Sequence, residues 1–182
     1  MTLKECIKLI KMDLARIDTP SMGSLLKHYL LPRGEVFKFN VWLRLTQWSK
    51  SYKITKYTVG ILVYAIMRHY EYKYGIHVNA NINIGGGLLI VHGDGVHLNV
   101  KNIGENVTVY QGVTCGSKDI NHGKDIPTIE DNVVIYTNSV VVGNIILRND
   151  SIIGANSYVS YDVNPGSVVA GIPAVSIRRK RD

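Results

Sequence analysis

Apolar residues near the start of the chain recur with the spacing of an amphipathic helix. Leu3, Ile7, Ile10, Leu14 and Ile17 follow one another at alternating steps of four and three residues. This spacing places them on one face of a helix, with lysines off that face. The pattern therefore predicts a first helix that buries this apolar face against the rest of the protein.

Further helices are predicted before Gly75. Residues 18–21 (DTPS) break the first helix and are suited to cap a second one, and residues 32–34 (PRG) break the chain again. Two more helices are predicted at residues 36–48 and 54–74. Gly75 is a suitable end for the last of them, because glycine readily adopts the left-handed conformation that follows many helices.

After Gly75 the hydrophobic period changes to six residues. One extra residue at Asn102 shifts the frame, and a loop at residues 117–128 interrupts it. The residues that start the repeats are Val78, Ile84, Ile90, Val96, Ile103, Val109, Cys115, Ile129, Ile135, Val141, Leu147, Ile153 and Val159. A six-residue period is typical of a parallel β-helix, in which three repeats close one coil. The predicted fold is a mainly β solenoid preceded by a helical region.

Composition places the chain among globular proteins, with 46% hydrophobic and 19% charged residues in 182. Cys6 and Cys115 lie far apart and outside any metal-binding spacing, so we expect neither a disulfide framework nor a metal. No apolar run approaches the roughly 20 residues of a membrane-spanning helix, and no signal peptide is recognised. We expect a cytoplasmic protein, with peripheral attachment at the inner membrane surface as an alternative.

The net charge is +7, and part of the excess lies in a basic tail at residues 178–181 (RRKR). The chain has neither zinc-finger spacing nor an RNA-binding signature, so we expect no nucleic-acid partner. Two interpretations of the tail stay open. It is either a solvated chain end or a contact for the phosphates of a nucleotide, through Arg178.

Five segments together resemble the hexapeptide-repeat acyltransferases: VHGDG (91–95), TVYQGVTCG (108–116), PTIEDNV (127–133), SIIGANSYV (151–159) and VAGIPA (169–174). They look most like the serine acetyltransferase branch, which includes sugar O-acetyltransferases of capsule and lipopolysaccharide synthesis. The resemblance implies a left-handed coil, acetyl-CoA as donor, and a homotrimer with sites between subunits, or a dimer of such trimers. We divide the chain into a helical region (1–75), an acetyltransferase domain (76–174) and a basic tail (175–182).

His92 is the predicted catalytic base. Acetyl transfer to a hydroxyl needs a group that takes the hydroxyl proton, and the pKa of histidine suits this task near neutral pH. His92 is the third residue of its repeat, where we expect it to point outward, and the glycines beside it leave room for a ligand. The family motif matches at this residue. The alternative is an ordinary surface histidine on a turn.

Repeat arithmetic predicts the neighbours of His92. Residues three repeats apart lie one coil apart on the same face, so Gln111, Thr137 and then Ala155 follow His92 in one column. The small side chains of this column would let the extended arm of acetyl-CoA lie against the backbone, and Gly116 and Ser117 would flank the groove. The alternative is that small residues are simply common in such coils.

Other candidate site residues surround this column. The acidic residue that orients the catalytic histidine in serine acetyltransferases aligns with His77, and Asp94 and Gln111 are further candidates for orienting His92 or for the acceptor site. His97 and His122, the latter in the loop, are candidates for contacting the acceptor. Solvated surface histidines are the alternative for both.

Two positions bear on the acceptor. Serine acetyltransferases similar to this chain have an aspartate before the catalytic histidine and a histidine before the proline that ends the loop. Here Val91 and Ile126 occupy these positions and cannot pair with the charges of serine. We therefore predict acetylation of a sugar hydroxyl in capsule or lipopolysaccharide synthesis. Serine O-acetylation is the alternative, and a non-catalytic trimeric β-helix that presents a surface is a second one.

Overall fold

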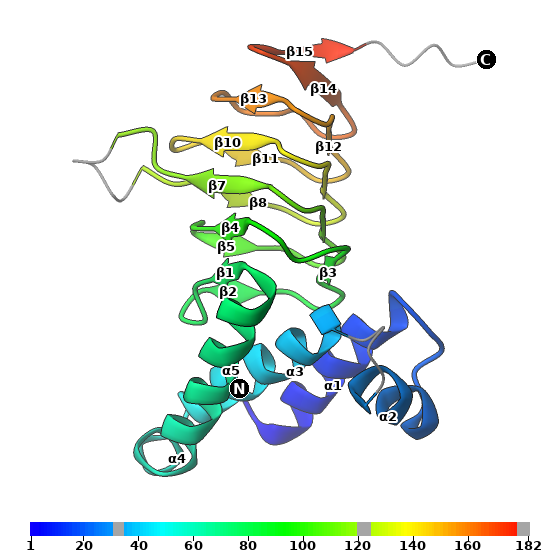
Figure 1. Ribbon diagram of the computed structural model, residues 1–182. Coiled ribbons are helices and arrows are strands. Elements are labelled where there is room, and N and C mark those ends of the chain that lie inside the picture. The colour runs from blue at the N-terminus through cyan, green and yellow to red at the C-terminus, as the bar shows by residue number, and fades with distance from the viewer. Residues whose placement is uncertain (31–34, 120–124, 178–182) are drawn as a thin grey trace.

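A computed structural model describes residues 1–30, 35–119 and 125–177. Helices at the start of the chain form a base, and a solenoid of about five coils stands on it (Figure 1). The helices are α1 (Leu3–Ala15), α2 (Met22–Leu30), α3 (Glu35–Ser49), α4 (Lys53–Tyr57) and α5 (Val59–Tyr74). The predicted fold class, a β solenoid preceded by helices, is confirmed.

Helix α1 starts where its sequence favours a start. The Thr2 hydroxyl accepts a hydrogen bond from the Glu5 amide, and the Glu5 carboxylate accepts one from the Thr2 amide. This reciprocal pair satisfies two amide groups that would otherwise lack partners at the helix start.

The buried face of α1 differs from the predicted apolar stripe. Ile10 and Leu14 are buried, but Leu3, Ile7 and Ile17 are exposed by 50%, 46% and 41%. Cys6 and Asp13 are buried instead. The prediction was wrong for three of the five stripe residues, and the face of the helix that carries Cys6 and Asp13 lies inward instead.

The predicted helix at residues 54–74 is two helices. Thr58 lies between α4 and α5 with φ −111° and ψ −96°, outside the helical region of backbone conformation. Helix α5 then runs to Tyr74 and ends at Gly75, which has a left-handed φ of 60°. An L-residue with a side chain would be strained there.

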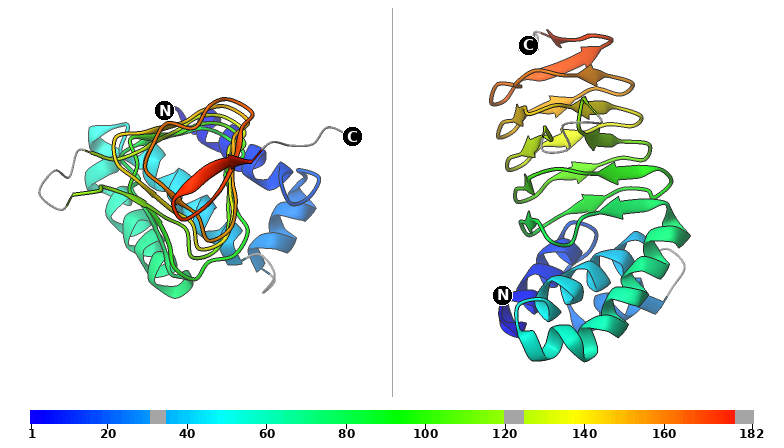
Figure 2. Two further views of the ribbon diagram at one scale, coloured as in Figure 1. Left: turned by 90° about the horizontal axis from the view of Figure 1, so that it is seen from above. Right: turned by 90° about the vertical axis from the view of Figure 1, so that its left-hand side faces the viewer.

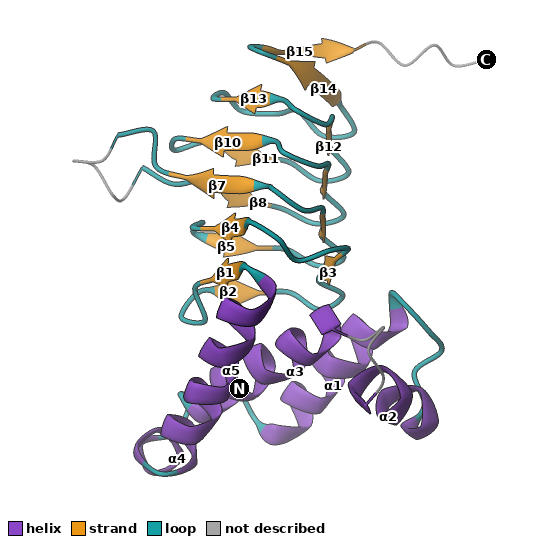
Figure 3. Cartoon of the chain, viewed as in Figure 1, coloured by secondary structure: helices purple, strands orange, loops and turns teal. Residues whose placement is uncertain are grey.

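The solenoid is built of short strands that return every third element to the same face. Three sheets result, with the orders β1-β4-β7-β10-β13, β11-β8-β5-β2 and β15-β14-β12-β9-β6-β3. We call them sheets A, B and C, and Figures 2 and 3 show them stacked coil upon coil. The strands are β1 (Ile76–Val78), β2 (Asn83–Ile84), β3 (Leu89–Ile90), β4 (Val96–Leu98), β5 (Asn102–Ile103), β6 (Thr108–Val109), β7 (Thr114–Gly116), β8 (Thr128–Ile129), β9 (Val134–Ile135), β10 (Val140–Val142), β11 (Ile146–Leu147), β12 (Ile152–Ile153), β13 (Tyr158–Val159), β14 (Val168–Gly171) and β15 (Ala174–Ile177).

The first residues of the predicted repeats form the core of the solenoid. All of them, from Val78 to Val159, are at most 4% exposed. Strand pairing is parallel throughout the described coils except at the far end, where β14 pairs with β15 in antiparallel fashion. The chain turns back there and covers the last coil.

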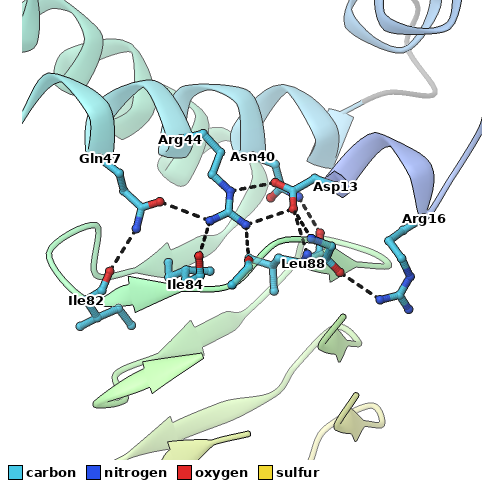
Figure 4. Close-up of polar contacts among 10 residues, drawn as sticks. Asp13, Arg16, Asn40, Arg44, Gln47, Ile82, Ile84 and Leu88 are labelled. Carbon is cyan, nitrogen blue, oxygen red and sulfur yellow. Dashed lines mark hydrogen bonds and ion pairs between the residues drawn. The ribbon is translucent and has the colours of Figure 1, made fainter. Parts of the chain in front are cut away.

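A buried ion pair joins the helices to the first coil (Figure 4). Arg44 of α3 is fully buried and donates to both carboxylate oxygens of Asp13 of α1, over 2.9 and 3.0 Å. Such a two-point contact fixes the orientation of both side chains.

Both partners of this pair also bind backbone groups of the coil. Asp13 accepts from the amides of Gly87 and Leu88, each over 2.9 Å. Arg44 donates to the carbonyls of Ile84 at 2.7 Å and Gly85 at 2.6 Å. The charges are therefore hydrogen-bonded as well as paired, which buried charges need in order to be tolerated.

Candidate functional site

His92 lies on the turn between sheets C and A, and its side chain is exposed. The turn is attached to the end of α5. The amide of Asp94 donates to the carbonyl of Tyr74 over 2.7 Å, and the amide of Gly95 donates to the carbonyl of Gly75 over 2.9 Å. His92 therefore presents an exposed imidazole from a backbone that is held in place.

The glycines beside His92, Gly93 and Gly95, are also favoured by the local backbone. A Cβ atom added to Gly93 would lie 2.3 Å from the Tyr74 carbonyl oxygen, so only glycine fits this contact. Gly95 has a φ of 83°, which also favours glycine. Gly93 thus makes room for the end of α5.

The strand register aligns the column that repeat arithmetic predicts. Ile90 pairs with Val109, Val109 with Ile135, and Ile135 with Ile153. Two residues after each of these positions come the members of the column, which are His92, Gln111, Thr137 and Ala155. The Thr137 hydroxyl donates to the Gln111 carbonyl over 3.0 Å. The four residues occupy successive coils at one corner of the solenoid.

Gln111 has an unused polar atom. Its side-chain oxygen Oε1 is buried and accepts no hydrogen bond from any described residue. A buried acceptor without a donor costs roughly 1–3 kcal/mol. A hydrogen-bond donor supplied by a substrate or by a second subunit would remove this cost. Gln111 lies one coil away from His92, so such a donor would bind close to the predicted base.

His77 and His97 lie side by side on the outer face of sheet A. They are paired in the register of β1 and β4, and their rings stack with centroids 4.7 Å apart. Tyr72 packs edge-on against His77 at 6.3 Å. Within the described ranges, no hydrogen bond joins His92 to His77, His97 or Asp94. Among the described residues of one chain, His92 thus has no carboxylate partner.

A hollow of about 240 Å³, which we call the histidine hollow, lies over these two rings. Arg68 and Glu71 of α5 line it and form an ion pair of 2.5 Å. Its full lining is Arg68, Glu71, His77, Val78, Asn79, His97, Leu98 and Asn99. Neither Arg68 nor Glu71 is among the site residues predicted from the sequence. Their signal is a pair of opposite charges three residues apart on a helix that is otherwise mostly apolar and aromatic.

The residues predicted to contact the donor fall into two groups. Thr137 and Ala155 lie at the corner between sheets C and A. Gly116 ends β7 at the opposite edge of sheet A, where its carbonyl accepts from the Gly143 amide. Ser117 follows Gly116, and its hydroxyl donates to the Asp119 carbonyl over 2.5 Å. Gln111 and Gly116 are separated by five residue steps, which span at most roughly 16 Å of extended chain, and strand β7 lies between this corner and Gly116.

Two predicted residues, His122 and Arg178, lie outside the described residues. Val91 and Ile126 are described, and both are half-buried. In the part of the chain that the structure describes, no group of three or more histidine, cysteine, aspartate or glutamate side chains is arranged to hold a metal ion. None of the described helices combines the length and apolarity needed to cross a bilayer.

Known proteins that share this architecture and are similar in sequence include serine acetyltransferases. No family model matches the chain. A serine acetyltransferase of Staphylococcus xylosus is 39% identical over 140 residues, which are 76% of this chain and 63% of that relative. The chain thus spans less than two thirds of the relative's length. A serine acetyltransferase of Neisseria gonorrhoeae in complex with serine matches 97% of this chain and 70% of its own, with a TM-score of 0.74 and 27% identity.

A serine acetyltransferase in complex with CoA shares the fold, with a TM-score of 0.75 over 96% of this chain and 71% of its own, at 21% identity. These relatives overturn the prediction of a sugar acceptor in polysaccharide synthesis, because they are serine acetyltransferases. That prediction took Val91 and Ile126 to exclude a charged acceptor. These two positions do not outweigh the 39% identity to a serine acetyltransferase over 76% of the chain.

The six-residue repeat, the coil and the relatives agree: the chain has the fold of the hexapeptide-repeat acyltransferases of the left-handed β-helix type and is similar to them in sequence.

Proposed function

We propose that this protein is a serine O-acetyltransferase that uses acetyl-CoA as donor. The observation that carries the proposal is the 39% identity to a serine acetyltransferase over 76% of the chain. The similarity to a structure in complex with serine and to one in complex with CoA supports the two substrates.

His92 is the proposed catalytic base. Its imidazole takes the proton of the serine hydroxyl while the hydroxyl oxygen attacks the thioester carbonyl carbon of acetyl-CoA. The carbon–sulfur bond then breaks, and the departing thiolate takes the proton from His92. The exposed position of His92 on a turn held by α5 supports this role, because a base must reach a substrate without losing its orientation.

We place the acetyl-CoA arm along Gln111, Thr137 and Ala155. Ala155 is exposed and Thr137 is half-buried, so this corner offers backbone groups and little side-chain bulk to an extended ligand. Gly116 and Ser117 lie at the other edge of sheet A. In our proposal they contact acetyl-CoA from a neighbouring subunit, whose edge of sheet A lies next to the corner formed by Gln111, Thr137 and Ala155. We therefore propose a homotrimer, for which light scattering would give about three times the 20.3 kDa of one chain.

Release of free CoA thiol from acetyl-CoA tests the activity directly. We expect release with L-serine, and mass spectrometry should identify O-acetylserine as the product. O-Methylserine keeps both charges of serine but lacks the hydroxyl, so it serves as the matched control and should give no release above background. An enzyme that releases no CoA with L-serine, or releases it equally with O-methylserine, would contradict the proposal.

The basic tail is the proposed contact for the phosphates of CoA, through Arg178. Calorimetry with CoA on the intact chain and on a chain that ends at Ile177 tests this contact. We expect weaker binding to the shortened chain, because lysine and arginine make charge-assisted bonds to phosphate. Equal affinity would remove the tail from the site and leave the donor assignment intact.

A further inference from the structure

A second cavity lies where the helices meet the first coil, and we call it the junction cavity. Its volume is about 330 Å³. The end of α3, helices α4 and α5, and the chain after β1 enclose it. Its lining is Ser49, Lys50, Lys56, Gly60, Ile61, Tyr64, Met67, Arg68, Glu71, Val78, Asn79, Ala80 and Asn81. None of the residues that we assign to acetyl transfer is among them.

Two lysines of the junction cavity have no carboxylate partner among the residues that the structure describes. Lys50 donates to the side-chain oxygen of Asn81 over 2.8 Å, and its ammonium nitrogen lies 5.3 Å from the centre of the Tyr64 ring. The ammonium nitrogen of Lys56 lies 5.3 Å from the centre of the Tyr57 ring. Among the described residues, neither lysine forms a salt bridge.

The one acidic residue of the lining is already engaged. The Glu71 carboxylate accepts from Arg68 over 2.5 Å and from the Val78 amide over 3.3 Å. Three cationic side chains and one carboxylate line the cavity, which leaves two positive charges unbalanced.

The positive charges of Lys50 and Lys56 repel one another. Burial lowers the pKa of Lys50, the positive charge of Lys56 lowers it further, and the negative charge of Glu71 raises it in part. An anion between them would turn this repulsion into attraction, and partial burial weakens the screening of such contacts by water.

We infer that the junction cavity binds a small organic anion, with a carboxylate or phosphate group between Lys50 and Lys56. Ile61, Met67 and Ala80 give the rest of the cavity apolar walls that suit an apolar or planar body. The cavity volume is at the lower end of the range of roughly 300–1,000 Å³ for small-molecule sites, so the ligand is small. The inference does not depend on the identity of the acetyl acceptor.

Calorimetry with benzoate and phenyl phosphate tests the site, and benzyl alcohol serves as the uncharged control. We expect at least one of the two anions to bind the full chain and the alcohol to bind more weakly. The two anions separate a carboxylate ligand from a phosphate ligand. Failure of both anions to bind, or equal binding of the alcohol, would overturn the inference.

Lys50→Met and Lys56→Met should each weaken binding of the anion by roughly tenfold or more, because each removes a charge-assisted contact. Lys56 is exposed, so its variant keeps the bond between Lys50 and Asn81 and should fold normally. Lys53→Met is the matched control, since Lys53 is an exposed lysine of α4 outside the cavity lining. Unchanged binding in Lys56→Met, or an equal loss in Lys53→Met, would overturn the site.

Discussion

The interior of the coil and the junction with the helices are held together by different interactions. Inside the coil, aliphatic residues stack on their equivalents in the next coil, and the same contact repeats from Val78 to Val159. At the junction, one buried ion pair binds four backbone groups of residues 84–88. A repeated apolar contact tolerates local change, whereas the ion pair has a single geometry in which every charge and hydrogen bond is satisfied.

The first prediction concerns activity at the turn where these two regions meet. His92→Ala should lower turnover about 10²- to 10⁴-fold, the usual contribution of a positioned general base. Affinity for CoA and the unfolding midpoint should stay unchanged, because the side chain is exposed. Steady-state kinetics and calorimetry would measure these quantities.

His69→Ala is the matched control for this substitution, since His69 is an exposed histidine on α5. It should keep wild-type turnover. Full activity in His92→Ala would exclude His92 as the base.

The second prediction concerns a substitution that removes the ion pair at the junction. Asp13→Ala should lower the free energy of unfolding by about 3–5 kcal/mol, because it leaves the Arg44 charge buried without a partner. Urea denaturation followed by circular dichroism would measure the loss.

The double variant Asp13→Leu with Arg44→Met tests whether the unpaired charge is the cause. It should lose less stability than Asp13→Ala, because it buries no charge, although the backbone groups of residues 84–88 still lose partners. The single variants Asp13→Leu and Arg44→Met complete the comparison. If the loss of unfolding free energy in the double variant equals the sum of the losses in these two, the side chains act independently.

The third prediction concerns substitutions in the apolar core of the coil. Ile135→Ala should cost about 2–5 kcal/mol of unfolding free energy, whereas Ile135→Val should cost about 0.5–1.5 kcal/mol, because the side chain is fully buried. Chemical denaturation of both variants would measure the difference. Val134→Ala on the half-buried outer face should cost less than Ile135→Ala, and a larger cost would contradict the inward stacking.

The fourth prediction compares the two regions through their cysteines. Burial raises the pKa of Cys6 and raises that of Cys115 to about 12, so neither native thiol should react at neutral pH. In urea below the unfolding midpoint, Cys6 should be alkylated roughly tenfold faster than Cys115.

Cys6 should react faster because it lies in the smaller of the two hydrophobic cores. Cys6 lies in a small buried cluster with Ile10, Leu14 and Phe37, and Cys115 lies in the continuous core of the coil. Mass spectrometry of the labelled peptides would measure both rates. Equal rates would mean that the helices and the coil open together.

Much of the fold could be predicted from the sequence. The six-residue period identifies the inward residues of the coil because each repeat makes nearly the same contacts, so the pattern is local. The end of α5 at Gly75 and the alignment of His92 with Gln111 follow from equally local signals. The roles of these residues in acetyl transfer stay predictions.

The sequence by itself determined the coil and the place of His92 on an exposed turn, because both depend on neighbours a few residues away. Only the tertiary structure decided which face of α1 is buried, since Asp13 meets Arg44 across 31 residues. It also decided that Gly93 accommodates the Tyr74 carbonyl and that Lys50 and Lys56 share a cavity. Long-range pairing of charges leaves no periodic trace in a sequence, whereas repeated burial of aliphatic side chains does.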